Sequence, residues 1–324
     1  MNAIDRKLEL FPRRRYSLLP TPVHEIPVFL EMFGLHVYCK RDDLTGFGFG
    51  GNKSRKLDFL IAEALDQGCD TLLAVGANQS NFCRMVAAYG SASGMQVHLL
   101  LGGREPPTPT GNLLIDHMLD ARRHHMDSSD WHAWEEEARS LEQRLIKSGR
   151  KVYRMPIGGS TPVGALGCVQ AMSEIIDDEV RLGLQFDYIV LASGSGGTQA
   201  GLLTGKSIAG WPGKIIGMSV AKDSSAQSLD ISKLATDTAK LLETTAVTDT
   251  IVVDDSYIGD GYGCRTPACE EAVGFFARRC GIFLDHVYTG KAAAGLIDYL
   301  RTGRFDAGSR VLFLHTGGNV ELFE

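Results

Sequence analysis

The sequence has no apolar run that approaches the roughly 18 residues a helix needs to cross a membrane. Residues 1–7 carry charges and no apolar core, so we predict no signal peptide. Basic residues form no extended stripe, and the run Arg13 to Arg15 is better explained as a solvated or subunit-contact patch than as a nucleic-acid site. No fixed-period repeat or low-complexity tract is visible. These absences argue against membrane-spanning, secreted, nucleic-acid-binding and repeat proteins.

The cysteines do not form a disulfide framework, because they are seven in number and scattered along the chain. We therefore expect a soluble cytoplasmic protein of a reducing compartment. A metal is not expected either. The histidines of residues 124–132 lie in a polar connector without a recognised ligand spacing, and Cys264 and Cys269 lack a second pair.

The chain of 324 residues is 44% hydrophobic and 22% charged, with a formal net charge of −6, an ordinary globular composition. Its length predicts two domains. Short apolar runs alternate with helical patterns, which predicts parallel sheets covered by helices. Residues 1–45, with several prolines, are predicted to be an extended lead-in with one short helix, and residues 102–111 a loop. The expected strands are residues 71–75, 97–101, 151–155, 188–192, 215–220, 251–253 and 311–314.

A glycine-rich loop, residues 46–51, leads into an amphipathic helix that carries Lys53 near its start. Glycines let a backbone approach a ligand closely, and helix N-termini bind anions. A lysine amine held at such a place can attack a carbonyl and form a Schiff base. The neighbouring Arg55 and Lys56 would lower its pKa. A mobile surface loop with solvated lysines explains the same residues about as well.

A second glycine-rich turn, Ser193-Gly-Ser-Gly-Gly-Thr198, follows a predicted strand and opens a predicted helix. Free N–H groups and the helix dipole there favour a phosphate over a plain tight turn. Gln199 stands where a dinucleotide fingerprint has its third glycine, and neither a Walker A loop nor a nucleophile elbow fits. A polar turn at residues 76–81 also joins a strand to a helix. Because ligands of open α/β sheets bind at such turns, we expect both in a cleft between domains.

With these turns in place, the chain resembles the D-cysteine desulfhydrase and 1-aminocyclopropane-1-carboxylate deaminase family, pyridoxal-phosphate enzymes of fold type II. The resemblance runs nearly end to end, and its motifs are specific together although each alone is weak. They are Lys40-Arg-Asp-Asp43, Gly50-Gly-Asn-Lys-x-Arg-Lys-Leu57, Gln79-Ser-Asn81, Gly158-Gly-Ser160, Ser193-Gly-Ser-x-Gly-Thr198, Gly261-Tyr-Gly263, Val287-Tyr-Thr-Gly-Lys291 and His315-Thr-Gly-Gly318.

The resemblance implies an α/β fold with two domains, each a mostly parallel twisted sheet covered by helices, as in the tryptophan synthase β chain. A large cofactor-binding domain would comprise residues 1–50 and 161–324, and a small domain residues 51–160. The family also implies pyridoxal 5'-phosphate as cofactor, a small amino acid as substrate and a homodimer.

The resemblance also implies roles for individual residues. Lys53 would hold the cofactor and move the α-proton, Ser80 and Asn81 would grip the substrate carboxylate, and Thr289 would face the pyridine nitrogen. The catalytic residues would be Lys53, Ser80, Tyr262 and Tyr288. The cofactor-binding residues would be Asn52, Lys53, Gly194, Ser195, Gly196, Gly197, Thr198, Thr289 and Thr316. The substrate-binding residues would be Gln79, Ser80, Asn81, Tyr262 and Tyr288.

The reaction is indicated by Thr289, where the deaminase branch carries glutamate. A neutral hydroxyl holds a protonated ring nitrogen less well, so a good β-leaving group would help. This favours α,β-elimination from a cysteine-like amino acid by a carbon–sulfur lyase of the D-cysteine desulfhydrase type, releasing sulfide, pyruvate and ammonia. The open alternatives are sulfite release from L-cysteate, cyclopropane ring opening with deamination, and a specialised or non-catalytic cofactor-binding protein.

Two departures from the family leave the substrate open more than the cofactor. Phe82 stands where histidine or glutamine commonly follows Gln-Ser-Asn. Asn319-Val-Glu321 replaces a common Ala-Pro-Ala. Both lie near the expected substrate pocket.

Overall fold

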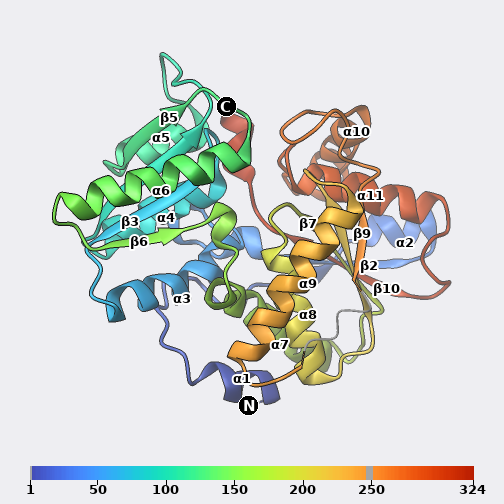
Figure 1. Ribbon diagram of the computed structural model, residues 1–324. Coiled ribbons are helices and arrows are strands. Elements are labelled where there is room, and N and C mark those ends of the chain that lie inside the picture. Colours follow the sequence, from blue (N-terminus) through green and yellow to red (C-terminus); the bar gives the residue numbers. More distant parts are fainter. Residues whose placement is uncertain (1, 246–250) are drawn as a thin grey trace.

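The computed structural model describes residues 2–245 and 251–324 (Figure 1). Its strands form two separate sheets, one of six strands and one of four. Helices cover both sheets, so the fold is α/β, as predicted. Among the described residues, no helix combines the length and apolarity required to cross a membrane.

The six-stranded sheet has the order β1-β2-β10-β7-β8-β9, and its neighbouring strands run parallel except for β1 against β2. Residues alternate between its two faces, as a two-residue period requires. In β10, Val311 and Phe313 pack with α2, α10 and α11, whereas Leu312 and Leu314 pack with α1, α7, α8 and α9. The strands are β1 (Val23–Glu25), β2 (His36–Arg41), β7 (Tyr188–Ser193), β8 (Lys214–Ser219), β9 (Val252–Asp254) and β10 (Arg310–His315).

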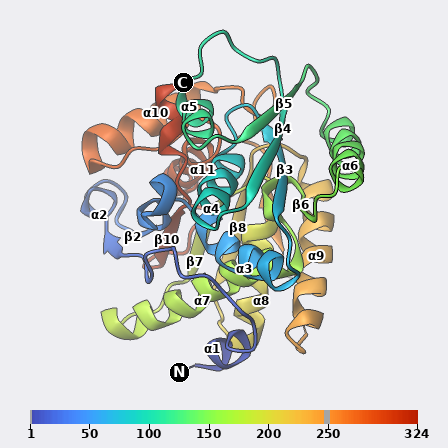
Figure 2. The same ribbon diagram turned by 90° about the vertical axis from the view of Figure 1, so that its left-hand side faces the viewer.

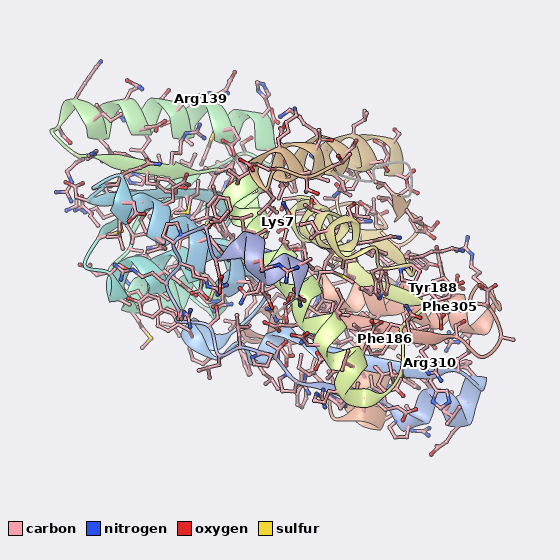
Figure 3. The ribbon with its side chains drawn as sticks, turned by 90° about the horizontal axis from the view of Figure 1, so that it is seen from below. Lys7, Arg139, Phe186, Tyr188, Phe305 and Arg310 are labelled. Atoms are coloured by element: carbon pink, nitrogen blue, oxygen red, sulfur yellow. The ribbon has the colours of Figure 1, made fainter. Side chains whose placement is uncertain are left out.

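The helices around this sheet include two within residues 1–45, where one short helix was predicted. They are α1 (Ala3–Leu8), α2 (Pro27–Phe33), α7 (Pro162–Leu182), α8 (Gly197–Ala209), α9 (Ser224–Leu241), α10 (Pro267–Phe275) with a π-helical turn (Phe276–Cys280), and α11 (Thr289–Arg301). Seen from below, α1 lies against this layer, and Lys7 donates to the Leu242 carbonyl (Figure 3). At the start of β7, the Tyr188 ring packs on Phe305 at 4.9 Å (Figure 3).

The four-stranded sheet is entirely parallel, in the order β5-β4-β3-β6. Its strands are β3 (Thr71–Ala77), β4 (Gln96–Gly102), β5 (Arg122–Met126) and β6 (Val152–Met155). Figure 2 shows α6 (Trp131–Lys147) on one side of this sheet and α4 (Asn81–Ala92) with α5 (Gly111–Met118) on the other. The helix α3 (Lys53–Asp66) contributes Leu57, Leu60 and Ile61 to the core that α4 and α5 share.

The strands of the smaller sheet come from residues 71–155, and those of the larger sheet from the segments on either side. This arrangement is consistent with two domains, and the boundaries given above for them stay a prediction. Residues 1–45 contain more regular structure than predicted, because β2 is an inner strand of the sheet, next to β10. Lys40 and Arg41 interrupt the apolar pattern of this strand, so the sequence did not indicate it. Likewise β5, which is made of Arg-Arg-His-His-Met, and α5, which follows the prolines, were not expected.

A buried group of charges joins the two halves. Arg55 of α3 is fully buried and donates to both oxygens of Asp42 and to both of Glu174, each at 2.8 Å. Asp42 begins the short helix η1 (Asp42–Leu44), and Glu174 lies on α7. Lys40 of β2 adds ion pairs with Glu174 at 3.1 Å and Asp178 at 2.7 Å. Buried charges are costly unless paired, and here each of them is paired.

We predict that Arg55→Leu destabilises the protein by about 3–5 kcal/mol, because it removes the ion pair of buried Asp42 and leaves Glu174 with Lys40 alone. The free energy of unfolding from urea titration measures this. Arg104→Ala is the control, since Arg104 and Asp127 form a pair whose side chains are 83% and 64% exposed, and it should change stability by less than about 1 kcal/mol. Equal effects of the two substitutions would contradict the prediction.

The same cluster of buried charges should make the stability of the protein depend on pH. Burial alone raises the pKa of Glu174, but Arg55 and Lys40 outweigh burial and hold it below its ordinary value of 4.5. A lowered carboxyl pKa contributes stability above the ordinary value and loses it as the pH falls. Wild type should therefore lose stability below about pH 4.5, and this part of the acid dependence should be weaker in Arg55→Leu, where only Lys40 remains to lower the pKa of Glu174.

Candidate active site

The loop before α3 is fixed from both sides. The Gly51 N–H lies 3.0 Å from the Asp42 carbonyl, and the Asn52 N–H donates to the Thr316 carbonyl beyond β10 at 2.9 Å. Gly50 has φ +71°, and a Cβ there would stand 2.2 Å from the Asp43 carbonyl oxygen. Only glycine fits this conformation without displacing the backbone. Lys53, the first residue of α3, is therefore held in a fixed position.

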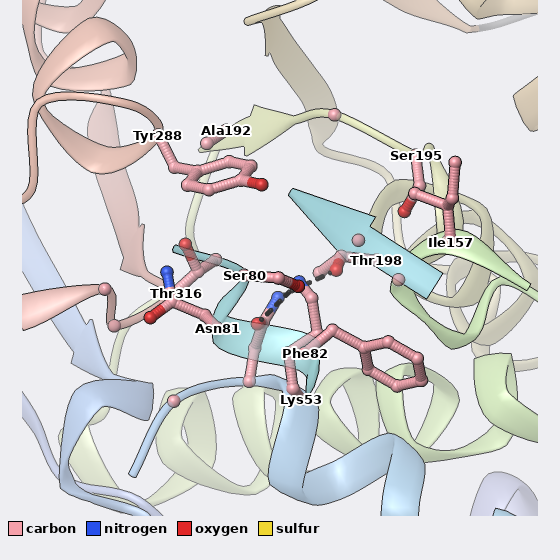
Figure 4. A pocket seen from close by; sticks show the side chains of 18 of the residues that line it. Lys53, Ser80, Asn81, Phe82, Ile157, Ala192, Ser195, Thr198, Tyr288 and Thr316 are labelled. Atoms are coloured by element: carbon pink, nitrogen blue, oxygen red, sulfur yellow. Dashed lines mark hydrogen bonds between the residues drawn. The ribbon is translucent and has the colours of Figure 1, made fainter. Parts of the chain in front are cut away.

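The Lys53 side chain lines a pocket between the two sheets and donates to Asn52 Oδ1 at 3.1 Å (Figure 4). Burial, and next the charge of Lys56, lower the pKa of Lys53 to about 7. A lowered amine pKa leaves a large neutral, nucleophilic fraction at neutral pH. The expectation for Lys56 is confirmed, whereas that for Arg55 is wrong, because Arg55 turns to Asp42 and Glu174.

The turn after β7 lies across the same pocket. Gly194 to Thr198 all line it, and α8 begins at Gly197, so first-turn N–H groups without helical acceptors face the cavity. Asn52 Nδ2 donates to Thr198 Oγ1 at 2.9 Å, which ties this turn to the lysine loop (Figure 4). Ser160 donates to Ser195 at 2.8 Å.

Lys56 has a second role that the sequence did not reveal. It is fully buried and donates to the Gly158 carbonyl at 3.0 Å. A Cβ built on Gly197 would stand 2.5 Å from Lys56 Nζ and 2.6 Å from Ser160 Oγ. A lysine ammonium and a serine hydroxyl therefore lie directly beside the start of α8. This combination suits a phosphate.

The turn before α4 supplies a second anion site. Ser80 is the N-cap of α4, where its Oγ accepts from the Cys83 N–H at 3.2 Å, and it lines the pocket together with Asn81 (Figure 4). A helix N-terminus with a hydroxyl and an amide suits a carboxylate. Gln79 differs from these two residues, because its Oε1 accepts from the Asn112 N–H at 2.8 Å and it is not among the described residues that line the pocket.

Two hydrogen-bonded tyrosines form part of the pocket wall. The hydroxyls of Tyr262 and Tyr288 lie 2.5 Å apart, and both side chains line the pocket. Burial raises the pKa of Tyr262 to about 12. Burial, and next the contact with Tyr262, raise the pKa of Tyr288 well above its ordinary value. Both stay protonated at neutral pH, so the pair can donate a proton or a hydrogen bond.

The two threonines proposed as cofactor contacts differ. Thr316 lines the pocket. Thr289 is fully buried and does not belong to the lining set in the described part of the chain. Its hydroxyl donates to Asp285 Oδ1 at 2.6 Å and accepts from the Asp285 N–H at 3.0 Å. The role of Thr289 stays a prediction.

Sequence reasoning missed Trp131, which lines the pocket from the start of α6. Its ring meets that of Tyr262 edge-on at 5.3 Å, and Lys222 Nζ lies 5.8 Å from the ring centroid. Both contacts cross from the smaller-sheet half to the larger-sheet half. A tryptophan at a helix start carries no sequence signal for such a contact. Phe82, noted as a departure, is buried and also lines the pocket.

These features define an α/β enzyme that holds a phosphate-bearing cofactor with a carbonyl beside a nucleophilic lysine. The phosphate fits the start of α8 with Lys56, and the carbonyl fits Lys53. The family model described as "Pyridoxal-phosphate dependent enzyme" matches residues 15–317. The chain belongs to this family, and its cofactor is pyridoxal 5'-phosphate.

Comparisons with individual proteins support this family assignment. The chain is 36% identical over 311 residues to a Pyrococcus furiosus protein named "Putative 1-aminocyclopropane-1-carboxylate deaminase", covering 96% of this chain and 93% of the relative. A Pyrococcus abyssi protein of the same name is 36% identical over 326 aligned positions, covering 99% and 96%. A crystal structure titled as an ACC deaminase homologue superposes with a TM-score of 0.93 at 35% identity, covering 100% and 97%. A pyridoxal-phosphate-dependent aspartate racemase, 16% identical with a TM-score of 0.71 and coverage of 99% and 95%, shares the fold.

We predict that in the apo-protein Lys53 reacts with a half-maximal rate near pH 7 instead of near pH 10.5. Reductive methylation across a pH series, read by peptide mass spectrometry, measures the midpoint. Lys56→Gln should raise this midpoint because it removes a like charge, whereas Lys147→Gln on the exposed end of α6 should not. A wild-type midpoint near 10.5 would contradict the prediction.

Proposed function

We propose that the enzyme catalyses α,β-elimination on a cysteine-like amino acid, as a carbon–sulfur lyase of the D-cysteine desulfhydrase type. The observation that carries the proposal is the residue at position 289, a threonine whose hydroxyl proton is directed to Asp285. Pyridoxal phosphate, when bound, delocalises the electron pair left at the substrate Cα. Thr289, in the role proposed for it beside the ring nitrogen, would be a neutral partner and would weaken that delocalisation, so departure of a β-substituent would take up the electrons.

Each step has a candidate group in the pocket. Lys53 Nζ takes the α-proton, and a base with a pKa about 7 suits neutral pH. The Cβ–S bond breaks with its electron pair on sulfur while a Cα=Cβ double bond forms. The Tyr262–Tyr288 pair lies on the same pocket and can protonate the departing sulfide. Hydrolysis of the resulting enamine by water gives pyruvate and ammonia.

The second candidate is cyclopropane ring opening with deamination, favoured by the name of the Pyrococcus relatives. Sulfite release from L-cysteate uses the same elimination with a different leaving group. Phe82 and the segment Asn319–Phe323 support a specialised or non-catalytic cofactor-binding protein. We further propose a cytoplasmic location, supported by seven cysteines that are all free thiols.

We predict that D-cysteine gives sulfide and pyruvate in equal amounts, in a panel that also holds L-cysteine, L-cysteate, β-chloroalanine, D-serine and 1-aminocyclopropane-1-carboxylate. Assays for 2-oxo acid, ammonia and sulfide identify the products. Lys53→Ala should lose the visible absorbance of bound cofactor and at least about 10³-fold in rate, because it removes both the attachment and the base.

The other outcomes separate the alternatives. Formation of 2-oxobutyrate from the cyclopropane substrate alone would overturn the elimination proposal in favour of deamination. Bound cofactor without ammonia release from any member of the panel would favour the hypothesis of a non-catalytic cofactor-binding protein. Equal rates for wild type and Lys53→Ala would remove Lys53 from the mechanism.

We also propose a homodimer, supported by Phe49 in the lysine loop. This residue has φ +68°, a strained value for a bulky side chain, and its ring is 72% exposed. Covering the ring with a second copy would stabilise this conformation. Phe49→Asp should shift light-scattering mass toward the monomer, while Val180→Asp, also exposed, should not. A wild-type monomer at micromolar concentration would contradict the proposal.

A further inference from the structure

Asn112 lies directly behind the turn that carries Ser80 and Asn81. It is fully buried in the first turn of α5, a helix that sequence reasoning did not predict. Its Oδ1 accepts from Arg84 Nε at 2.7 Å. Its Nδ2 donates to the Gln79 carbonyl at 2.9 Å and to Asn81 Oδ1 at 3.1 Å. Both N–H donors of this amide and one lone pair of its oxygen are therefore used.

These partners fix which way the Asn112 amide faces. Arg84 can only donate, and the Gln79 carbonyl can only accept. A reversed amide would place N–H against N–H and oxygen against oxygen in a fully buried position. Arg84 is itself buried and held by the Gly50 carbonyl at 3.1 Å, so it cannot turn away freely. The orientation of Asn112 is thus imposed by the protein and does not depend on a ligand.

This orientation is passed on to Asn81. Because Asn112 Nδ2 occupies Asn81 Oδ1, the Nδ2 group of Asn81 is the end that remains for a ligand. Asn81 lines the pocket beside Ser80 (Figure 4). An amide that presents donors attracts a carboxylate, whereas an amide that presents its oxygen repels one. Asn112 therefore determines whether the turn attracts or repels a negatively charged group such as a carboxylate.

We propose that Asn112 is a positioning residue that holds the Asn81 amide with its donors toward the pocket and so makes the turn selective for the α-carboxylate of the substrate. The proposal rests on the proposed carboxylate-binding role of Ser80 and Asn81. It does not depend on which β-substituent leaves, because every candidate substrate carries the carboxylate.

Asn112→Asp tests this with an isosteric change. The aspartate keeps an acceptor for Arg84 Nε but loses the donor, so its second oxygen meets Asn81 Oδ1 and the Gln79 carbonyl. Asn81 then gains by reversing its amide, which turns its oxygen toward the pocket. Loss of a hydrogen bond to a charged group is expected to weaken binding about 10- to 100-fold.

The measurement is titration of the cofactor-loaded enzyme with D-alanine or L-alanine and with ethylamine, which lacks a carboxylate, followed by the visible absorbance of the bound cofactor. We expect Asn112→Asp to weaken alanine binding about 10- to 100-fold while leaving ethylamine binding near wild type. Asn81→Asp, which keeps a bond from Asn112 and puts an oxygen in the pocket, should show the same selective loss. It supplies the test should Asn112→Asp fail to fold.

A double-mutant cycle separates positioning from general damage. In an Asn81→Ala background, Asn112→Asp should change alanine affinity less than about 3-fold, because the group it acts through is gone. Equal alanine binding by wild type and Asn112→Asp would overturn the proposal, and so would an equal loss for ethylamine. Because binding is read without turnover, an enzyme inactive on all sulfur substrates would refute the proposed reaction while leaving this test intact.

Discussion

The buried ion pairs of Arg55 with Asp42 and Glu174 are the constraint on which the rest of the structure depends. Arg55 stands two residues after Lys53 on α3, and this helix packs Leu57 and Leu60 into the smaller-sheet core but Phe59 into the larger-sheet core. Hydrophobic contacts alone would allow such a helix to slide between the two cores. Four directional bonds from one guanidinium to Asp42 and Glu174 fix its start instead. Lys53, the proposed cofactor lysine, therefore takes its position from α7 and from the end of β2.

The pairing of Arg55 also shapes the electrostatics of the pocket. With two carboxylates beside it, Arg55 adds little to the potential at Lys53, and Lys56 is the cation that lowers the pKa there. Lys56 has no carboxylate partner among the described ion pairs and lies against Gly197. In the proposed site, this one ammonium would therefore serve both ends of the cofactor: it would keep Lys53 partly neutral for attack on a carbonyl, and it would offset the charge of the phosphate.

The sequence predicted the alternating strands and helices, because their apolar runs are local signals, and it predicted the glycine turns at residues 46–51 and 193–198. It did not predict β2, since Lys40 in that strand is neutralised by Glu174 and Asp178, more than a hundred residues away. Long-range pairing of this kind leaves no local pattern. For the same reason the expectation that Arg55 lowers the pKa of Lys53 was wrong, and Asn112 and Trp131 were missed: their partners come together only in the fold.

The residue at position 289 and the names of the relatives favour different reactions, and Asp285 connects the two. Its carboxylate is fully buried and accepts four bonds, from the N–H groups of Val287, Tyr288 and Thr289 and from the Thr289 hydroxyl. Burial raises the pKa of Asp285 while those bonds act in the opposite direction. Because the threonine proton is committed to Asp285 and the Asp285 N–H already donates to the Thr289 oxygen, that oxygen has one further lone pair with which to accept a hydrogen bond. A hydroxyl backed by a buried carboxylate is a stronger acceptor than an isolated one. In the role proposed for it at the ring nitrogen, Thr289 would therefore lie between a plain neutral partner and the glutamate of the deaminase branch, and the protonation state of Asp285 would decide how far toward deamination the site can go.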